Sequence, residues 1–77
     1  MISTVTSTAQ HDATEAAVAI LANNSVRELR TLRVDRDANH LQLSGRVRSF
    51  YHKQLAQEAV RAVAAGLTVV NRVDVAR

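Results

Sequence analysis

The residues of this chain that could combine in acid–base, nucleophilic or metal chemistry are its three histidines and Ser49. His11 lies near the N-terminus, His40 in a polar stretch between two apolar runs, and His52 three residues after Ser49. No two histidines have the i, i+4 spacing of a helical metal site, and cysteine is absent, so we expect no metal site and no cofactor. Ser49 and His52 could form a nucleophile and its base, but no third group that would orient them is apparent in the sequence. Ser49 is better explained as a helix cap, and we expect no enzymatic activity.

Arginine side chains offer a second kind of chemistry, the binding of anions. Ten basic residues, all but one of them arginine, outnumber seven acidic ones and give a formal net charge of +3. This excess is compatible with an anionic partner without requiring one. Arg33, Arg46 and Arg72 share the polar parity of the expected strands with Asp35 and Asp74, and guanidinium groups suit phosphate oxygens. Cross-strand ion pairing is the interpretation we prefer, with the three arginines as a secondary anion patch.

The two aromatic residues of the chain, Phe50 and Tyr51, are neighbours and lie between Arg48 and Lys53. Counting about 100° per residue from the apolar stripe of the helix expected here places Phe50 on its solvent side. An exposed aromatic among cations can enter a membrane interface or a groove of a partner, and a helix N-terminus attracts anions. We therefore predict that Arg48, Phe50, Tyr51 and Lys53 contact an anionic phospholipid surface or a protein partner. Local packing of Phe50 against the hairpin is the structural alternative.

Apolar residues at helical spacing predict two helices. The first is expected over residues 13–23, with Asp12 and Glu15 as a capping box at its start. A single turn is expected over residues 26–29, because Ser25 and Glu28 repeat the box spacing. The second helix follows Ser49 and ends at Gly66, which we expect as its C-cap. Its inward stripe consists of Leu55, Ala56, Ala59, Val60 and Val63.

Alternating apolar and polar residues predict three strands, over residues 31–36, 41–47 and 69–75. Asn39 is the expected left-handed residue of the hairpin turn between the first two. Gly45 interrupts an apolar row, which indicates a close neighbour, expected to be the following helix. Asn71 is a polar exception on the apolar parity of the last strand.

The element order is helix, strand, strand, helix, strand, and it predicts an α+β fold. The hairpin pairs antiparallel, and the strand–helix–strand crossover makes the second and third strands parallel, giving a three-stranded mixed sheet. Since each strand has one apolar parity, both helices must pack on one face. Residues 1–12 are predicted to be a disordered leader, and residues 13–77 form the single small domain. No window approaches the ~20 apolar residues of a membrane span.

Three motifs in this order resemble the BON domain of bacteria. They are Leu-x-Leu-Ser-Gly-x-Val-x-Ser at residues 41–49, Lys-x-Leu-Ala-x-x-Ala-Val-x-x-Val at 53–63 and Val-Val-Asn-x-Val-x-Val at 69–75. The chain departs from the family in having Asn39 where a turn glycine is usual and in the residues after the second helix. The resemblance implies a small non-enzymatic binding module, suspected of attaching to phospholipid surfaces or protein partners.

The same topology is similar to KH-like nucleic-acid-binding domains, which are the alternative. A KH domain needs a Gly-x-x-Gly loop, and with only Gly45 and Gly66 the chain has none, so a nucleic-acid partner is disfavoured. The N-terminal residues lack the continuous apolar run of a signal peptide, and we expect a cytoplasmic protein. The family resemblance favours envelope association as the alternative location.

Overall fold

The computed structural model describes residues 13–76 of the chain. The leader prediction and the Asp12 half of the capping box lie outside the described residues. A first helix covers residues 13–22, close to its predicted end at residue 23. The other elements, in chain order, are η1 (Arg27–Thr31), β1 (Arg33–Asp37), β2 (His40–Ser44), β3 (Arg46–Val47), α2 (Phe50–Arg61), β4 (Thr68–Asn71) and β5 (Asp74–Val75).

The predicted strands pair as expected. β1 is antiparallel to β2, β2 is parallel to β4, and β3 is parallel to β5. His40 pairs with Thr68 and Arg46 with Asp74, so both parallel ladders have the same register. The backbone N–H of Asp74 donates to the carbonyl of Gly45 at 2.9 Å and continues the pairing across the break. The predicted second and third strands are therefore each two collinear pieces.

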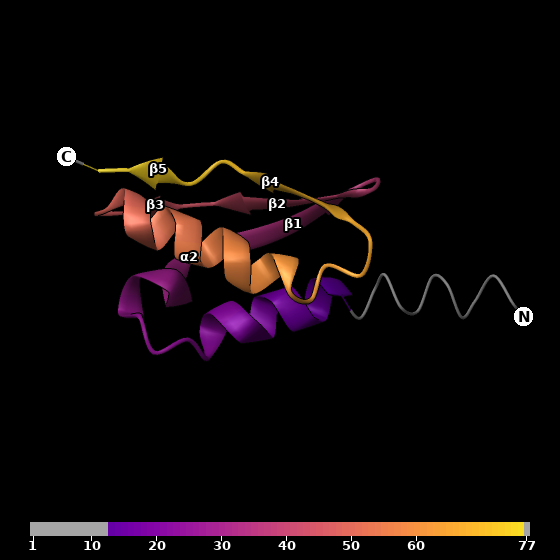
Figure 1. Ribbon diagram of the computed structural model, residues 1–77, viewed down its shortest axis with the longest axis horizontal. Coiled ribbons are helices and arrows are strands. Elements are labelled where there is room, and N and C mark those ends of the chain that lie inside the picture. The colour runs from indigo at the N-terminus through magenta and orange to yellow at the C-terminus, as the bar shows by residue number, and fades with distance from the viewer. Residues whose placement is uncertain (1–12, 77) are drawn as a thin grey trace, which may run out of the picture.

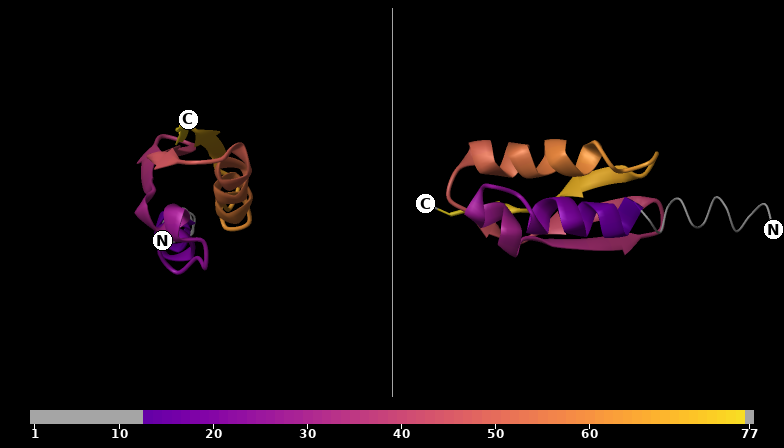
Figure 2. Two further views of the ribbon diagram at one scale, coloured as in Figure 1. Left: turned by 90° about the vertical axis from the view of Figure 1, so that its left-hand side faces the viewer. Right: turned by 90° about the horizontal axis from the view of Figure 1, so that it is seen from below.

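Both helices lie on the same side of the sheet, which confirms the predicted α+β fold (Figures 1 and 2). Figure 1 shows the strands along one side of the molecule and both helices along the other. The core between these layers consists of aliphatic and alanine side chains, and alanines such as Ala17 and Ala56 allow close approach of helix and sheet. Its buried members are Ala13, Ala17, Leu21, Leu29, Leu32, Leu41, Leu43, Val47, Ala56, Val60, Ala64, Leu67 and Val73.

Gly45 has a close neighbour, but not the one that the sequence predicted. A Cβ at this position would lie 2.7 Å from Cδ2 of Leu32, and φ of Gly45 is +132°. Arg33 pairs with Ser44, so the hairpin places the buried Leu32 opposite Gly45. The prediction of a close approach is confirmed, and its assignment to the following helix is wrong.

The turns differ from prediction in two places. The left-handed residue of the hairpin is Ala38, with φ +54°, and not Asn39, because the turn needs a positive φ at its first residue. α2 ends at Arg61 with Ala62 as its C-cap, so Gly66 is not the C-cap. Gly66 instead follows Ala65 in a separate turn, where both residues have positive φ.

The first strand begins at Arg33 and not at residue 31. A 3-10 helix, η1, runs from Arg27 to Thr31 and occupies the start of the predicted strand. The turn predicted at residues 26–29 is thus present in a longer form. It is stabilised by Asn24, whose side-chain oxygen accepts from the backbone N–H of Val26 at 2.8 Å, and not by a Ser25–Glu28 box.

Candidate functional site

The start of α2 is organised by Ser49, as the sequence predicted. Ser49 is in an extended conformation, and its Oγ accepts a hydrogen bond from the backbone N–H of His52 at 3.1 Å. This cap satisfies one of the free N–H groups of the first turn. The serine that could have been a nucleophile is thereby occupied in the structural role expected for it.

The two aromatic residues open the helix, and both are exposed. Phe50 retains 62% and Tyr51 68% of its accessible surface. The angular position predicted for Phe50 is thus confirmed, and the alternative that it packs against the hairpin is wrong. The Arg48 side chain is 90% exposed, and Lys53 is half-buried. We call Arg48, Phe50, Tyr51 and Lys53 the attachment patch; its role as a contact surface stays a prediction.

Glu28 of η1 bonds two residues at the attachment patch, Arg48 and His52. Its Oε1 accepts from the backbone N–H of Arg48 at 2.8 Å and lies 2.9 Å from Nδ1 of His52. Its Oε2 lies 3.6 Å from Nε of Arg48. The bond from the Arg48 backbone and the bond to the His52 ring lower the pKa of Glu28 below its ordinary value of 4.5. Glu28 is therefore ionised at neutral pH and fixes the segment that leads into α2.

Sequence reasoning missed this role of Glu28, and the expectation that no third group orients His52 is wrong. The sequence offered a local explanation, a box with Ser25, whereas the partners of Glu28 lie 20 and 24 residues further along the chain. No spacing rule connects residues so distant, and only the fold brings η1 beside the start of α2.

Asn71 of β4 holds the same turn of α2 from the sheet side. Its Nδ2 donates to the carbonyl of Lys53 at 2.9 Å and to Oε1 of Gln57 at 3.2 Å. Its Oδ1 accepts from the backbone N–H of Val73 at 3.1 Å. The polar exception in the last strand is thus fully bonded. It ties α2 to the interruption between β4 and β5.

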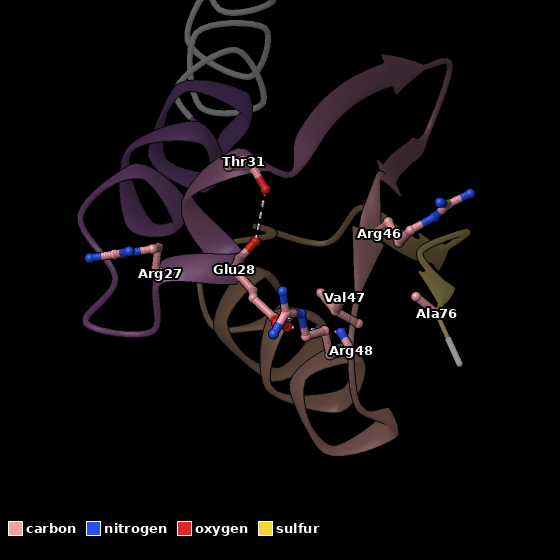
Figure 3. A pocket seen from close by; sticks show the side chains of 7 residues that line it. All are labelled: Arg27, Glu28, Thr31, Arg46, Val47, Arg48 and Ala76. Carbon is pink, nitrogen blue, oxygen red and sulfur yellow. Dashed lines mark hydrogen bonds and ion pairs between the residues drawn. The ribbon is translucent and has the colours of Figure 1, made fainter.

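A hollow of about 550 Å³ lies next to the attachment patch, between η1 and β3 (Figure 3). In Figure 3 the Arg48 side chain lies across Glu28, while Arg27 and Arg46 point outward on opposite sides. The guanidinium groups at its rim therefore do not converge on one point. The hollow is lined by Arg27, Glu28, Thr31, Arg46, Val47, Arg48 and Ala76.

The secondary anion patch lies on the uncovered face of the sheet. Arg33, Arg46 and Arg72 are all exposed. Arg33 forms an ion pair with Asp35 of the same strand, 3.5 Å apart, so this pair runs along β1 and not across strands as predicted. Residues two apart on a strand share a face, which explains the contact. Arg46 lies beside Asp74 in the parallel register.

Residues 13–76 contain no candidate metal cluster and no candidate membrane-spanning helix. No group of three or more histidine, cysteine, aspartate or glutamate side chains there is arranged to hold a metal ion. Within the same residues, the helices are too short or too polar to span a bilayer.

Comparison with known proteins identifies one family. The model of the BON domain matches residues 9–77, which covers every element described above and confirms the resemblance carried by the three motifs. No curated protein sequence matches the chain at a significant level.

Proposed function

This chain belongs to the BON domain family, and on that premise we propose that it attaches to anionic phospholipid surfaces through the attachment patch. The family consists of non-catalytic binding domains, which supports a role by contact rather than by catalysis. The observation that carries the proposal is the exposure of Phe50 and Tyr51, at 62% and 68%, beside two cations at a helix N-terminus.

The residues of the attachment patch are of the types that a bilayer interface attracts. An aromatic side chain gains about 1.5–3 kcal/mol when it leaves water, and each cation near an anionic surface adds about 1 kcal/mol. For two aromatic residues and two cations the lower ends of these ranges add to about 5 kcal/mol, which corresponds to a dissociation constant of about 0.2 mM in accessible lipid. We therefore expect reversible attachment that needs a second anchor or a second module to become stable.

An NMR titration of the labelled chain tests the proposal. Vesicles with phosphatidylglycerol are compared with vesicles of phosphatidylcholine alone and with a random oligonucleotide. We expect binding to the anionic vesicles, and loss of it in the double variant Phe50→Ala with Lys53→Glu. The matched control is Val18→Ala with Arg61→Glu, which removes an exposed apolar side chain and reverses an exposed charge away from the patch.

Each outcome of this titration is informative. Full binding by the Phe50→Ala, Lys53→Glu variant would contradict the proposal and favour the face with Arg33, Arg46 and Arg72. Binding to the oligonucleotide alone would favour the KH-like alternative. Failure to bind either vesicle, with capture of a protein that needs Phe50, would replace the lipid by a protein partner.

A further inference from the structure

The ring of His52 is held in one orientation at the edge of the attachment patch. Its Nδ1 lies 2.9 Å from Oε1 of Glu28, and its backbone N–H is bonded to Ser49. The side chain is still 29% exposed. Within residues 13–76 no hydrogen bond to the opposite ring nitrogen, Nε2, is present, so Nε2 is the nitrogen left for a ligand.

The state of Nε2 depends on the proton it carries. A carboxylate can only accept, so the neutral ring must keep its proton on Nδ1 to bond Glu28, and Nε2 is then an acceptor. An acceptor cannot bond a phosphate oxygen. When the ring takes up a second proton, Nε2 becomes a charged donor while Nδ1 keeps its bond to Glu28. The carboxylate therefore fixes the ring so that one added proton changes Nε2 from an acceptor, which repels phosphate, to a donor, which binds it.

We propose that His52 is a proton-dependent phosphate contact of the attachment patch and that Glu28 is the residue that positions it. This inference rests on the proposed function and adds to it a chemical group, the headgroup phosphate, and a dependence on pH. The attachment patch would then bind anionic lipid more tightly in mildly acidic conditions than in mildly alkaline ones.

The charged groups around His52 support a change of one unit in the charge of the patch. Glu28 of η1 contacts the ring directly, and Arg48 of the segment before α2 pairs with the same carboxylate. On α2 the centroid of the Tyr51 ring lies 5.9 Å from that of His52, and Lys53 is the next residue along the helix. β4 contributes the neutral Asn71 to this turn. Since the pKa of Glu28 is lowered, its carboxylate stays ionised at pH 5.5 as it is at pH 8.

The test measures binding of the full chain to phosphatidylglycerol vesicles at about pH 5.5 and about pH 8, on either side of the range in which histidine titrates. We expect the wild type to bind about five-fold more tightly at the lower pH, the effect of one added cation near the surface. His52→Gln should bind equally at both values. The matched control, His11→Gln with His40→Gln, should keep the five-fold ratio.

Two further variants separate the contact from its positioning. His52→Lys carries a fixed charge and should bind at pH 8 about as tightly as the wild type does at pH 5.5. Glu28→Gln keeps an oxygen for the Arg48 backbone but loses the charged acceptor that fixes the His52 ring. Its ratio of binding at pH 5.5 to binding at pH 8 should therefore be smaller than that of the wild type.

The results distinguish failure of the inference from failure of the proposed function. Equal binding of the wild type at both pH values, or a pH dependence that survives in His52→Gln, would overturn the inference and leave lipid attachment intact. Absence of vesicle binding at both pH values would overturn both.

Discussion

The two ends of α2 are held in different ways. At its start, side chains of the N-cap Ser49, of Glu28 in η1 and of Asn71 in β4 form hydrogen bonds with the backbone of the first turn or of the residue before the cap. At its end, the chain leaves through backbone turns, and the buried side chains of Ala64 and Leu67 provide the packing. A hollow of about 410 Å³ beside this end is lined in part by Gln57, Arg61 and Thr68 and has no aromatic residue.

This difference indicates why polar contacts gather at the start of the helix. An exposed aromatic pair gains little from folding, because its side chains stay in water. Apolar packing therefore cannot position Phe50 and Tyr51, and bonds of defined length and direction do so instead. The end of α2 exposes no large apolar side chain among residues 62–67, and burial of small residues is sufficient there.

The largest expected effect comes from replacing Gly45, which lies between β2 and β3 in the segment that leads to α2. Gly45→Val places a side chain against Leu32 and forces a branched residue into a positive φ. We expect a loss of about 2–4 kcal/mol in the free energy of unfolding. Urea denaturation measures it. An unchanged midpoint would show that the close approach to Leu32 has no energetic importance.

Asn71→Ala should weaken the start of α2 more than its end. The substitution leaves the carbonyl of Lys53 and the N–H of Val73 without their side-chain partner, at a cost of about 1–3 kcal/mol. Amide exchange should become faster at Val73 and in the first turn of α2, with the turn at residues 62–67 little changed. Equal acceleration at both ends would contradict a local role.

Acid should release the start of α2 first. The folded-state pKa of Glu28 is lowered, so its contribution to stability is complete above the unfolded value, about 4.5, and is lost as pH falls through the lower folded value. Melting temperatures measured from pH 7 down to pH 3 should fall less in Glu28→Gln than in the wild type. Parallel curves for the two proteins would argue against this coupling.

The smallest effects are expected at two alanines with positive φ. Ala38 and Ala65 have φ of +54° and +53°, which glycine adopts more easily. Glycine removes the strain of a Cβ at positive φ but increases the conformational entropy of the unfolded chain. The net effect of each change should be a rise of up to about 1 kcal/mol in the free energy of unfolding. Since Ala65 lies beyond the end of α2 and Ala38 in the hairpin, neither substitution should alter vesicle binding. A change in binding with Ala65→Gly would extend the site to that end.

Much of this fold could be predicted from local patterns. Periodicity located both helices and the regions of the strands, and the crossover rule predicted the parallel pairing. The count from the apolar stripe correctly placed Phe50 on the solvent side of α2. The features that could not be predicted depend on distant partners. Glu28 reaches Arg48 and His52 only because η1 folds against α2. The hairpin turn was located correctly, but its left-handed residue was misplaced by one position, because turn preference favoured Asn39 and the positive φ is at Ala38.

The most direct test of the central claim is the map of signals that change when phosphatidylglycerol vesicles are added to the labelled wild-type chain. We predict that the amide signals of residues 48–53 broaden first, while those of residues 62–67 at the other end of α2 stay sharp until much more lipid is present. Broadening that begins at residues 62–67, or at Arg33, Arg46 and Arg72 on the uncovered sheet face, would contradict the assignment of attachment to the start of α2.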